Sequence, residues 1–185
     1  MTDEQLIQEI ISGNTLAFKT LMEKYRERVF HVAMGFVHLK EDAEDLTQEV
    51  FIKVYLSLST FNHHSEFSTW LYRLTINTCI NFVNRNRGKR FLQSIEDVWQ
   101  SAFGQHDNEK SPLEKIEVSE RNLLIKQAID SLPAKQRSAF VLSKYEDLSQ
   151  KEVAAIMNIT EGAVEQLLQR AKNNLRKKLG PSIGN

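Results

Sequence analysis

The sequence predicts an all-α protein of two small helical domains joined by a flexible acidic linker, with the second domain a helix-turn-helix. Only 7 Gly and 3 Pro occur in 185 residues, which argues against a chain rich in β-turns. Apolar residues recur at helical spacing on both sides of a polar segment that holds Gly104 and Pro112. We therefore expect modules at residues 1–92 and 120–185, with residues 93–119 as the linker.

The net charge of zero is an average over unlike parts. Residues 93–119 hold 2 Lys and Arg against 6 Asp and Glu, whereas residues 120–185 hold 11 against 7. The lone Cys79 excludes a disulfide framework and a multi-cysteine zinc cage. The first residues are acidic and no apolar run reaches the roughly 18 residues of a membrane span, so we expect a cytoplasmic protein.

In the first module, Asn14 is a suitable N-cap for an amphipathic scaffold helix. The following segment, Glu41 to Leu58, predicts a helix with two unlike faces, one apolar and one acidic. The acidic face carries Glu41, Asp42, Asp45 and Glu49. Acidity alone also fits a solvated surface, but Ile52 and Leu56 project within the same arc. Carboxylates beside exposed aliphatic groups favour a docking surface for a basic, partly apolar protein.

The polar loop from Phe61 to Glu66 contains two adjacent histidines, His63 and His64. Neighbouring loop positions rarely direct two imidazoles at one ion, and no spaced third ligand completes a site. We therefore expect neither a metal nor another cofactor.

The segment Phe67 to Asn84 is apolar almost all round and should form a largely buried helix. One stripe of polar and aromatic residues interrupts it, formed by Trp70, Arg73, Asn77, Asn81 and Asn84. The stripe runs into a basic cluster that contains Arg85, Arg87, Lys89 and Arg90. Such a column can stack on bases, bond their edges and neutralise phosphates. A core tryptophan and a solvated helix end are the alternative, but the whole stripe favours nucleic acid.

The second module reads as three helices. Pro133 is expected at the first position of one helix, and the capping box from Ser149 to Glu152 starts the next at Gln150. After a short turn at Asn158 and Ile159, Thr160 can cap a third helix. Two short helices joined by a tight turn indicate a helix-turn-helix.

The third helix presents a candidate DNA-reading face opposite its apolar stripe. This face carries Gly162, Gln166, Gln169, Arg170, Asn173 and Lys177. Gln and Arg can bond bidentately to adenine and guanine edges in the major groove, whereas Arg176, Lys177 and Lys178 suit phosphates.

Taken together, several stretches resemble the extracytoplasmic-function (ECF) group of bacterial RNA polymerase sigma factors, in the sigma-70 family. The first is Asp42-Ala43-Glu44-Asp45-Leu46-Thr47-Gln48-Glu49-Val50-Phe51. The others are Phe67-Ser68-Thr69-Trp70-Leu71-Tyr72-Arg73-Leu74 with Asn77, Leu132-Pro133 with Arg137, and Leu148-Ser149 through to Arg170-Ala171-Lys172. The resemblance covers nearly the whole chain, so residues 1–92 would be sigma region 2 and residues 120–185 sigma region 4.

This resemblance implies roles for three sets of residues. The core-polymerase-binding set is Asp42, Asp45, Gln48, Glu49 and Ile52. The set for recognition and melting of the minus-ten element is Asn62, His63, His64, Ser65, Trp70, Arg73, Asn77, Arg85, Arg87, Lys89 and Arg90. The set for the minus-thirty-five element is Gln166, Gln169, Arg170, Asn173, Arg176 and Lys177. Core RNA polymerase, promoter DNA and an anti-sigma protein are the implied partners, with the acidic linker threading the polymerase channels.

The third helix of the second module departs from the commonest pattern of this group. Where many members carry Thr-Val-Lys-Ser-Arg-Leu, this chain has Ala163-Val164-Glu165-Gln166-Leu167-Leu168. The loss of Lys and Arg should weaken phosphate contacts and alter the preferred upstream sequence.

The expected function is that of a sigma factor without enzymatic activity. One alternative is a stand-alone helix-turn-helix regulator, which would not need the mixed face with Asp45, Glu49 and Ile52. A second alternative is an enzyme that acts on nucleic acid, but the carboxylates lie along one exposed helix face and suit docking better than metal chemistry.

Overall fold

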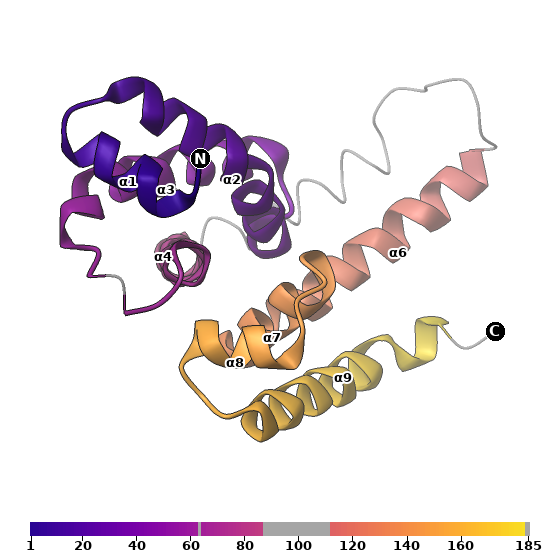
Figure 1. Ribbon diagram of the computed structural model, residues 1–185. Helices are drawn as coiled ribbons and strands as arrows, with labels where there is room; N and C mark the ends of the chain where they lie inside the picture. Colours follow the sequence, from indigo (N-terminus) through magenta and orange to yellow (C-terminus); the bar gives the residue numbers. More distant parts are fainter. Residues whose placement is uncertain (63, 87–111, 184–185) are drawn as a thin grey trace.

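The computed structural model describes residues 1–62, 64–86 and 112–183, and these residues form helices in both halves of the chain (Figure 1). The first domain contains α1 (Asp3–Ile11), α2 (Thr15–Val37), α3 (Lys40–Ser57), a 3₁₀ turn (Leu58–Thr60) and α4 (Phe67–Arg85). The second contains α6 (Pro112–Asp130), α7 (Ala134–Tyr145), α8 (Gln150–Met157) and α9 (Glu161–Ile183). The all-α prediction is confirmed.

Side-chain caps explain where several helices begin. The Asn14 Oδ1 accepts from the backbone N–H of Leu16 at 3.0 Å, as expected for the N-cap of α2. The sequence prediction does not include α1, although Thr2 and Gln5 form a capping box at its start. Pro133 is the N-cap of α7 and not its first helical residue, which corrects the sequence prediction.

The segment between the domains is described only in part. α6 begins at Pro112, within the range 93–119 that the sequence predicts as a linker. Residues 93–111 lie outside the described residues. α6 lies beside α9 in the second domain (Figure 1).

Two clusters of buried apolar residues hold the helices together. The first belongs to the N-terminal domain, where Leu21 and Val29 of α2 pack with Val50 and Val54 of α3 and with Leu71 of α4. Their burial removes apolar surface from water and is the main stabilising contribution to this domain.

The second cluster joins the two domains. Val32 and Phe36 of α2 and Ile76 of α4 share it with Val141 of α7 and Val153 of α8. This contact explains why α4 is apolar almost all round: one side faces its own domain, and the other faces the second domain.

Within residues 1–62, 64–86 and 112–183, none of the helices combines the length and the apolar character that a membrane span requires.

Candidate functional sites

The acidic face of α3 lies at the surface. Asp45 and Gln48 are exposed, Asp42 and Glu49 are half-buried, and Ile52 is 59% exposed. The carboxylate of Glu49 also forms an ion pair with Lys53 at 2.7 Å. All members of the predicted core-binding set therefore lie on the part of α3 that is not in the core.

An apolar extension of this face is larger than the sequence indicates. Tyr55 is 52% exposed and Leu56 is 72% exposed, next to Ile52 along α3. The ring of Phe18 in α2 packs edge-on against Tyr55, with ring centroids 5.1 Å apart. Tyr55 was missed by the sequence prediction, although its spacing of three residues from Ile52 places both on neighbouring positions of one helix surface.

The loop before α4 is polar and open. Asn62 and His64 are exposed, and the backbone N–H of His64 donates to the Asn62 side-chain oxygen at 3.4 Å. Ser65 is half-buried, whereas His63 lies outside the described residues. No group of three or more metal-ligating side chains occurs in the part of the chain that the structure describes.

Trp70 is half-buried at the start of the polar stripe on α4. Its ring packs against Phe61 and Phe67, with centroids 5.4 and 5.7 Å away. The sequence allowed Trp70 to be either a core residue or part of a surface for nucleic acid. The structure fits both, since one part of the side chain packs on the core and the rest reaches the surface.

The remainder of the stripe is mostly open. Asn77, Asn81, Asn84 and Arg85 are exposed. Arg87, Lys89 and Arg90 of the predicted basic cluster lie outside the described residues. The structure therefore brings Asn77 and Arg85 onto the same surface as the exposed part of Trp70, as helical spacing requires.

Arg73 belongs to the stripe predicted to contact nucleic acid, but its guanidinium is bonded within the protein. Its Nε donates to the Ile156 carbonyl at 2.9 Å, and its Nη2 donates to the Ala155 carbonyl at 2.6 Å. These carbonyls end α8, where the helix dipole favours a cation. The sequence does not reveal this contact, because the two partners are more than 80 residues apart.

The helix-turn-helix is confirmed at α8 and α9. Ser149 and Glu152 form the predicted capping box at the start of α8, and Asn158 ends the helix with φ 54°, the left-handed conformation that asparagine tolerates. The Thr160 hydroxyl accepts from the Ala163 N–H at 3.2 Å and caps α9.

The predicted reading face of α9 is available to a partner. Its exposed members are Gln166, Gln169, Arg170, Asn173, Arg176 and Lys177. Val164 and Ala171 are fully buried on the opposite side. Side chains that can bond to base edges therefore project from one side of a helix whose other side is fixed in the domain.

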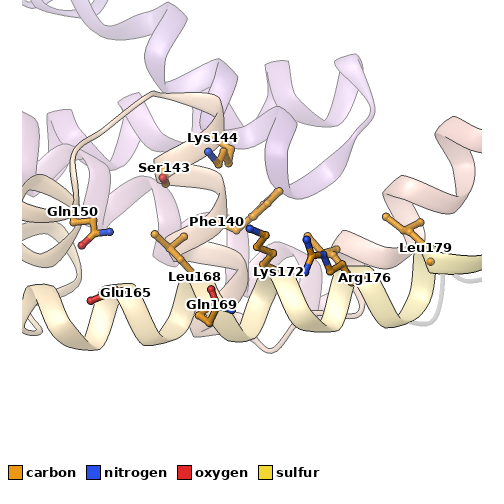
Figure 2. Close-up of a pocket in the computed structure, with 12 residues that line it drawn as sticks. Phe140, Ser143, Lys144, Gln150, Glu165, Leu168, Gln169, Lys172, Arg176 and Leu179 are labelled. Atoms are coloured by element: carbon orange, nitrogen blue, oxygen red, sulfur yellow. The ribbon is translucent and has the colours of Figure 1, made fainter. Parts of the chain in front are cut away.

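A groove runs along α9 beside this reading face (Figure 2). Phe140 of α7 and Leu168 and Leu175 of α9 provide apolar walls, while Lys144 and Lys172 add positive charge. Leu168 and Leu175 are only half-buried at this groove, although they share the apolar side of α9 with the buried Val164 and Ala171.

Each of the two helical domains matches a known protein family. Residues 21–89 match the family described as Sigma-70 region 2, and residues 122–175 match Sigma-70, region 4. The chain is 34% identical over 188 residues to the RNA polymerase sigma-H factor of Pseudomonas aeruginosa, covering 98% of this chain and 95% of that protein. It is 31% identical to the ECF RNA polymerase sigma-E factor of Escherichia coli K12, covering 99% and 97%.

Solved structures share the fold. CnrH, determined in complex with the cytosolic domain of CnrY, superimposes with a TM-score of 0.67 and 23% identity over 97% of this chain and 98% of that chain. RpoE from Bartonella quintana, determined with the anti-sigma factor NepR, gives a TM-score of 0.55 and 22% identity over 89% and 98%. With two sigma regions in order and whole-length relatives above 30% identity, the chain belongs to the family of ECF RNA polymerase sigma factors, which are not enzymes.

Proposed function

We propose that this protein binds core RNA polymerase and directs it to promoters through two separate DNA-recognising surfaces, without catalysing a reaction itself. The observation that carries the proposal is the presence, in one chain, of a carboxylate and aliphatic docking face on α3 and an exposed Gln and Arg face on α9. A regulator that acts without polymerase requires only the second of these surfaces.

The α3 face has the character of a protein docking surface. Asp45 supplies exposed negative charge, while Ile52 and Leu56 supply apolar area that is otherwise left in water. A basic partner with apolar groups would gain electrostatic complementarity and bury that area. In the proposed complex this partner is the core polymerase, and the contacting set is Asp42, Asp45, Gln48, Glu49 and Ile52.

The loop and stripe around α4 suit the minus-ten element. The exposed Asn62 and His64 can bond to an unstacked base, and the open part of Trp70 offers a stacking surface. Asn77 and Arg85 continue the strand path along the helix. His63, Ser65, Arg73, Arg87, Lys89 and Arg90 complete the proposed set, with Arg73 available once its contacts to α8 are released.

The α9 face suits the minus-thirty-five element. Gln166, Gln169 and Arg170 can reach base edges in the major groove, and Arg176 and Lys177 can contact phosphates. Glu165 is also exposed on this helix. Its charge lowers affinity for DNA in general, and the carboxylate can instead accept a bond from a cytosine amine.

Two further features are proposed by analogy. CnrH and RpoE were determined with CnrY and NepR, which supports control of this chain by an anti-sigma protein. A protein that serves core polymerase also works in the cytoplasm, where transcription takes place.

The docking face is tested by reversing its charge. We expect Asp45→Arg combined with Glu49→Arg to weaken binding of core polymerase at least about tenfold in a pull-down titration, because like charges would face the basic partner. The matched control is Glu23→Arg combined with Glu27→Arg, which makes the same charge change at the same spacing on exposed positions of α2. Equal binding by both double variants, with helicity retained in circular dichroism, would contradict the assignment of α3.

A further inference from the structure

The groove along α9 combines apolar walls with a cationic edge (Figure 2). It holds about 700 Å³ between α7 and α9, which is the size of a binding pocket. Phe140, Leu168 and Leu175 form its walls, and the exposed Lys172 and Arg176 line its edge. A surface of this kind fits a helix that presents carboxylates together with aliphatic side chains.

The same chain presents such a helix on its other domain. Asp45 and Glu49 in the first half of α3 are followed by Ile52 and Leu56 in the second half. These residues succeed one another at four, three and four positions, so they form one ridge on the helix surface, the α3 ridge. Its two aliphatic side chains are 59% and 72% exposed, so the chain's own fold leaves the ridge uncovered.

The ridge and the groove also match in length. Eleven residues separate Asp45 from Leu56 in α3, and eleven separate Leu168 from Leu179 along the groove in α9. Both segments are helical, so each spans about 16 Å at 1.5 Å per residue. The ridge can therefore lie along the groove without leaving either end of it unfilled.

The distribution of charge sets the direction in which the ridge fits. Along the groove, Glu165 lies in the first half of α9, whereas Lys172 and Arg176 lie further along the helix. The α3 ridge has its carboxylates first and its aliphatic residues second. An antiparallel arrangement therefore places Leu56 against the apolar walls and Asp45 near Arg176, and it keeps the ridge carboxylates away from Glu165.

The overall charge of the chain permits a second copy as the source of this helix. The 24 Lys and Arg balance the 24 Asp and Glu, and the isoelectric point is about 7.0. Two copies therefore have no net repulsion at neutral pH, while their local charges differ in sign at the ridge and at the groove.

We propose that the free protein self-associates, with the α3 ridge of one copy seated in the α9 groove of another. The contact covers Asp45 and Ile52 of the proposed core-polymerase set, and Gln169 and Arg176 of the proposed minus-thirty-five set. Self-association therefore competes with polymerase and with promoter DNA. This consequence rests on the proposed sigma function, whereas the association itself is a property of the free protein.

The contact should be weak, because one helix in one groove buries less surface than a standard protein interface. We expect a monomer of 21.4 kDa at about 1 μM and a higher average mass at about 100 μM. Sedimentation velocity of the full chain, without polymerase, measures both. A monomer throughout this concentration range would overturn the proposal.

The ridge is tested with Ile52→Ser combined with Leu56→Ser, a change that leaves the net charge unaltered. Loss of the apolar contact should lower the association constant at least about tenfold. The matched control is Ile11→Ser combined with Leu16→Ser, at positions that are 50% and 69% exposed. Equal association of the two double variants, with helicity retained in circular dichroism, would contradict the role of the ridge.

The groove is tested separately with Lys172→Gln combined with Arg176→Gln. We expect an association constant about fivefold lower or less, because the ridge carboxylates lose their partners. Lys126→Gln combined with Lys135→Gln is the charge-matched control, at exposed positions that do not line the groove. An equal effect of both changes would assign the association to net charge and overturn the groove assignment.

Mixing the ridge variant with the groove variant tests whether the two surfaces bind each other. The ridge variant keeps an intact groove and the groove variant keeps an intact ridge, so their equimolar mixture should regain association that each lacks alone. A mixture that stays monomeric would overturn the proposal. Because polymerase is absent, this failure leaves the sigma assignment intact, whereas failure of the dilute monomer to bind core polymerase would reject the proposed function.

Discussion

At the scale of single residues, arginine side chains of this chain occupy two unlike environments. Arg137 is buried and donates to a backbone carbonyl, whereas Arg170 is exposed on α9. Charged side chains are rarely buried unless paired, and Arg137 meets that condition with Phe36 and Asp130. Arginine content alone therefore does not predict the DNA-binding surface, whereas the periodicity of α9 predicts one on its exposed side.

The capping box of α8 provides a residue-scale prediction. Replacing Ser149 by Ala removes the bond to the Glu152 N–H, so we expect the second domain to lose about 1 kcal/mol of unfolding free energy in urea denaturation. Thr20→Ala, at an exposed hydroxyl within α2, is the control for loss of a side-chain oxygen. A change in unfolding free energy no larger than that of the control would contradict the role of the cap.

The same cap gives a pH dependence with a defined sign. Hydrogen bonds from Ser149 hold the pKa of Glu152 below its usual 4.5. The bound carboxylate therefore stabilises α8 fully above pH 4.5, and this stabilisation is lost as the pH falls through the lowered pKa. The Ser149→Ala variant should show a weaker loss of stability over that acidic range than the unmodified protein.

At the scale of elements, helical periodicity predicts most of what the structure shows. The faces of α3 and α9 follow from the spacing of apolar residues, and the caps at Asn14, Ser149 and Thr160 begin helices where expected. Helical periodicity did not predict α6, because Pro112 and its polar neighbours have the composition of a linker. α1 was also missed, since only its Thr2 and Gln5 capping box marks a short helix before Asn14.

The reading face of α9 carries an element-scale prediction. Replacing the exposed Arg170 by Ala should weaken recognition of the upstream element by about 1 to 3 kcal/mol at one base position, the scale of a bidentate contact to guanine. The measurement is holoenzyme binding to a panel of single-base promoter variants. Lys178→Ala, at an exposed basic position farther along α9, serves as the comparison for a phosphate contact. An equal loss on every promoter variant would show that Arg170 contacts only phosphate.

At the scale of the whole molecule, the sequence identifies two modules but not how they meet. The contacts of Arg73 with α8 and of Tyr72 with Glu146 join residues more than 70 positions apart. No local pattern encodes such pairs, because either partner would be equally compatible with a solvated surface. Gly35 is the clearest sign of the interdomain contact in the sequence. A glycine within a long helix is unfavourable, and the close approach of Val141 explains this one.

The proposed function also explains why three exposed surfaces occur together in one chain. In the proposed function, the α3 face binds core polymerase, and the exposed faces of α4 and α9 bind promoter DNA. Tethering all three in one chain converts promoter recognition into a property of the polymerase complex, since each contact raises the effective concentration of the next.

The most direct test of this account is transcription by purified core polymerase mixed with the protein and a pool of random promoter fragments. We predict transcripts with specific starts that neither component makes alone, and upstream sequences shared at two spaced elements. The absence of specific starts together with the absence of a stable complex, for a folded sample and active core polymerase, would contradict the sigma function and favour a DNA-binding regulator that acts without polymerase.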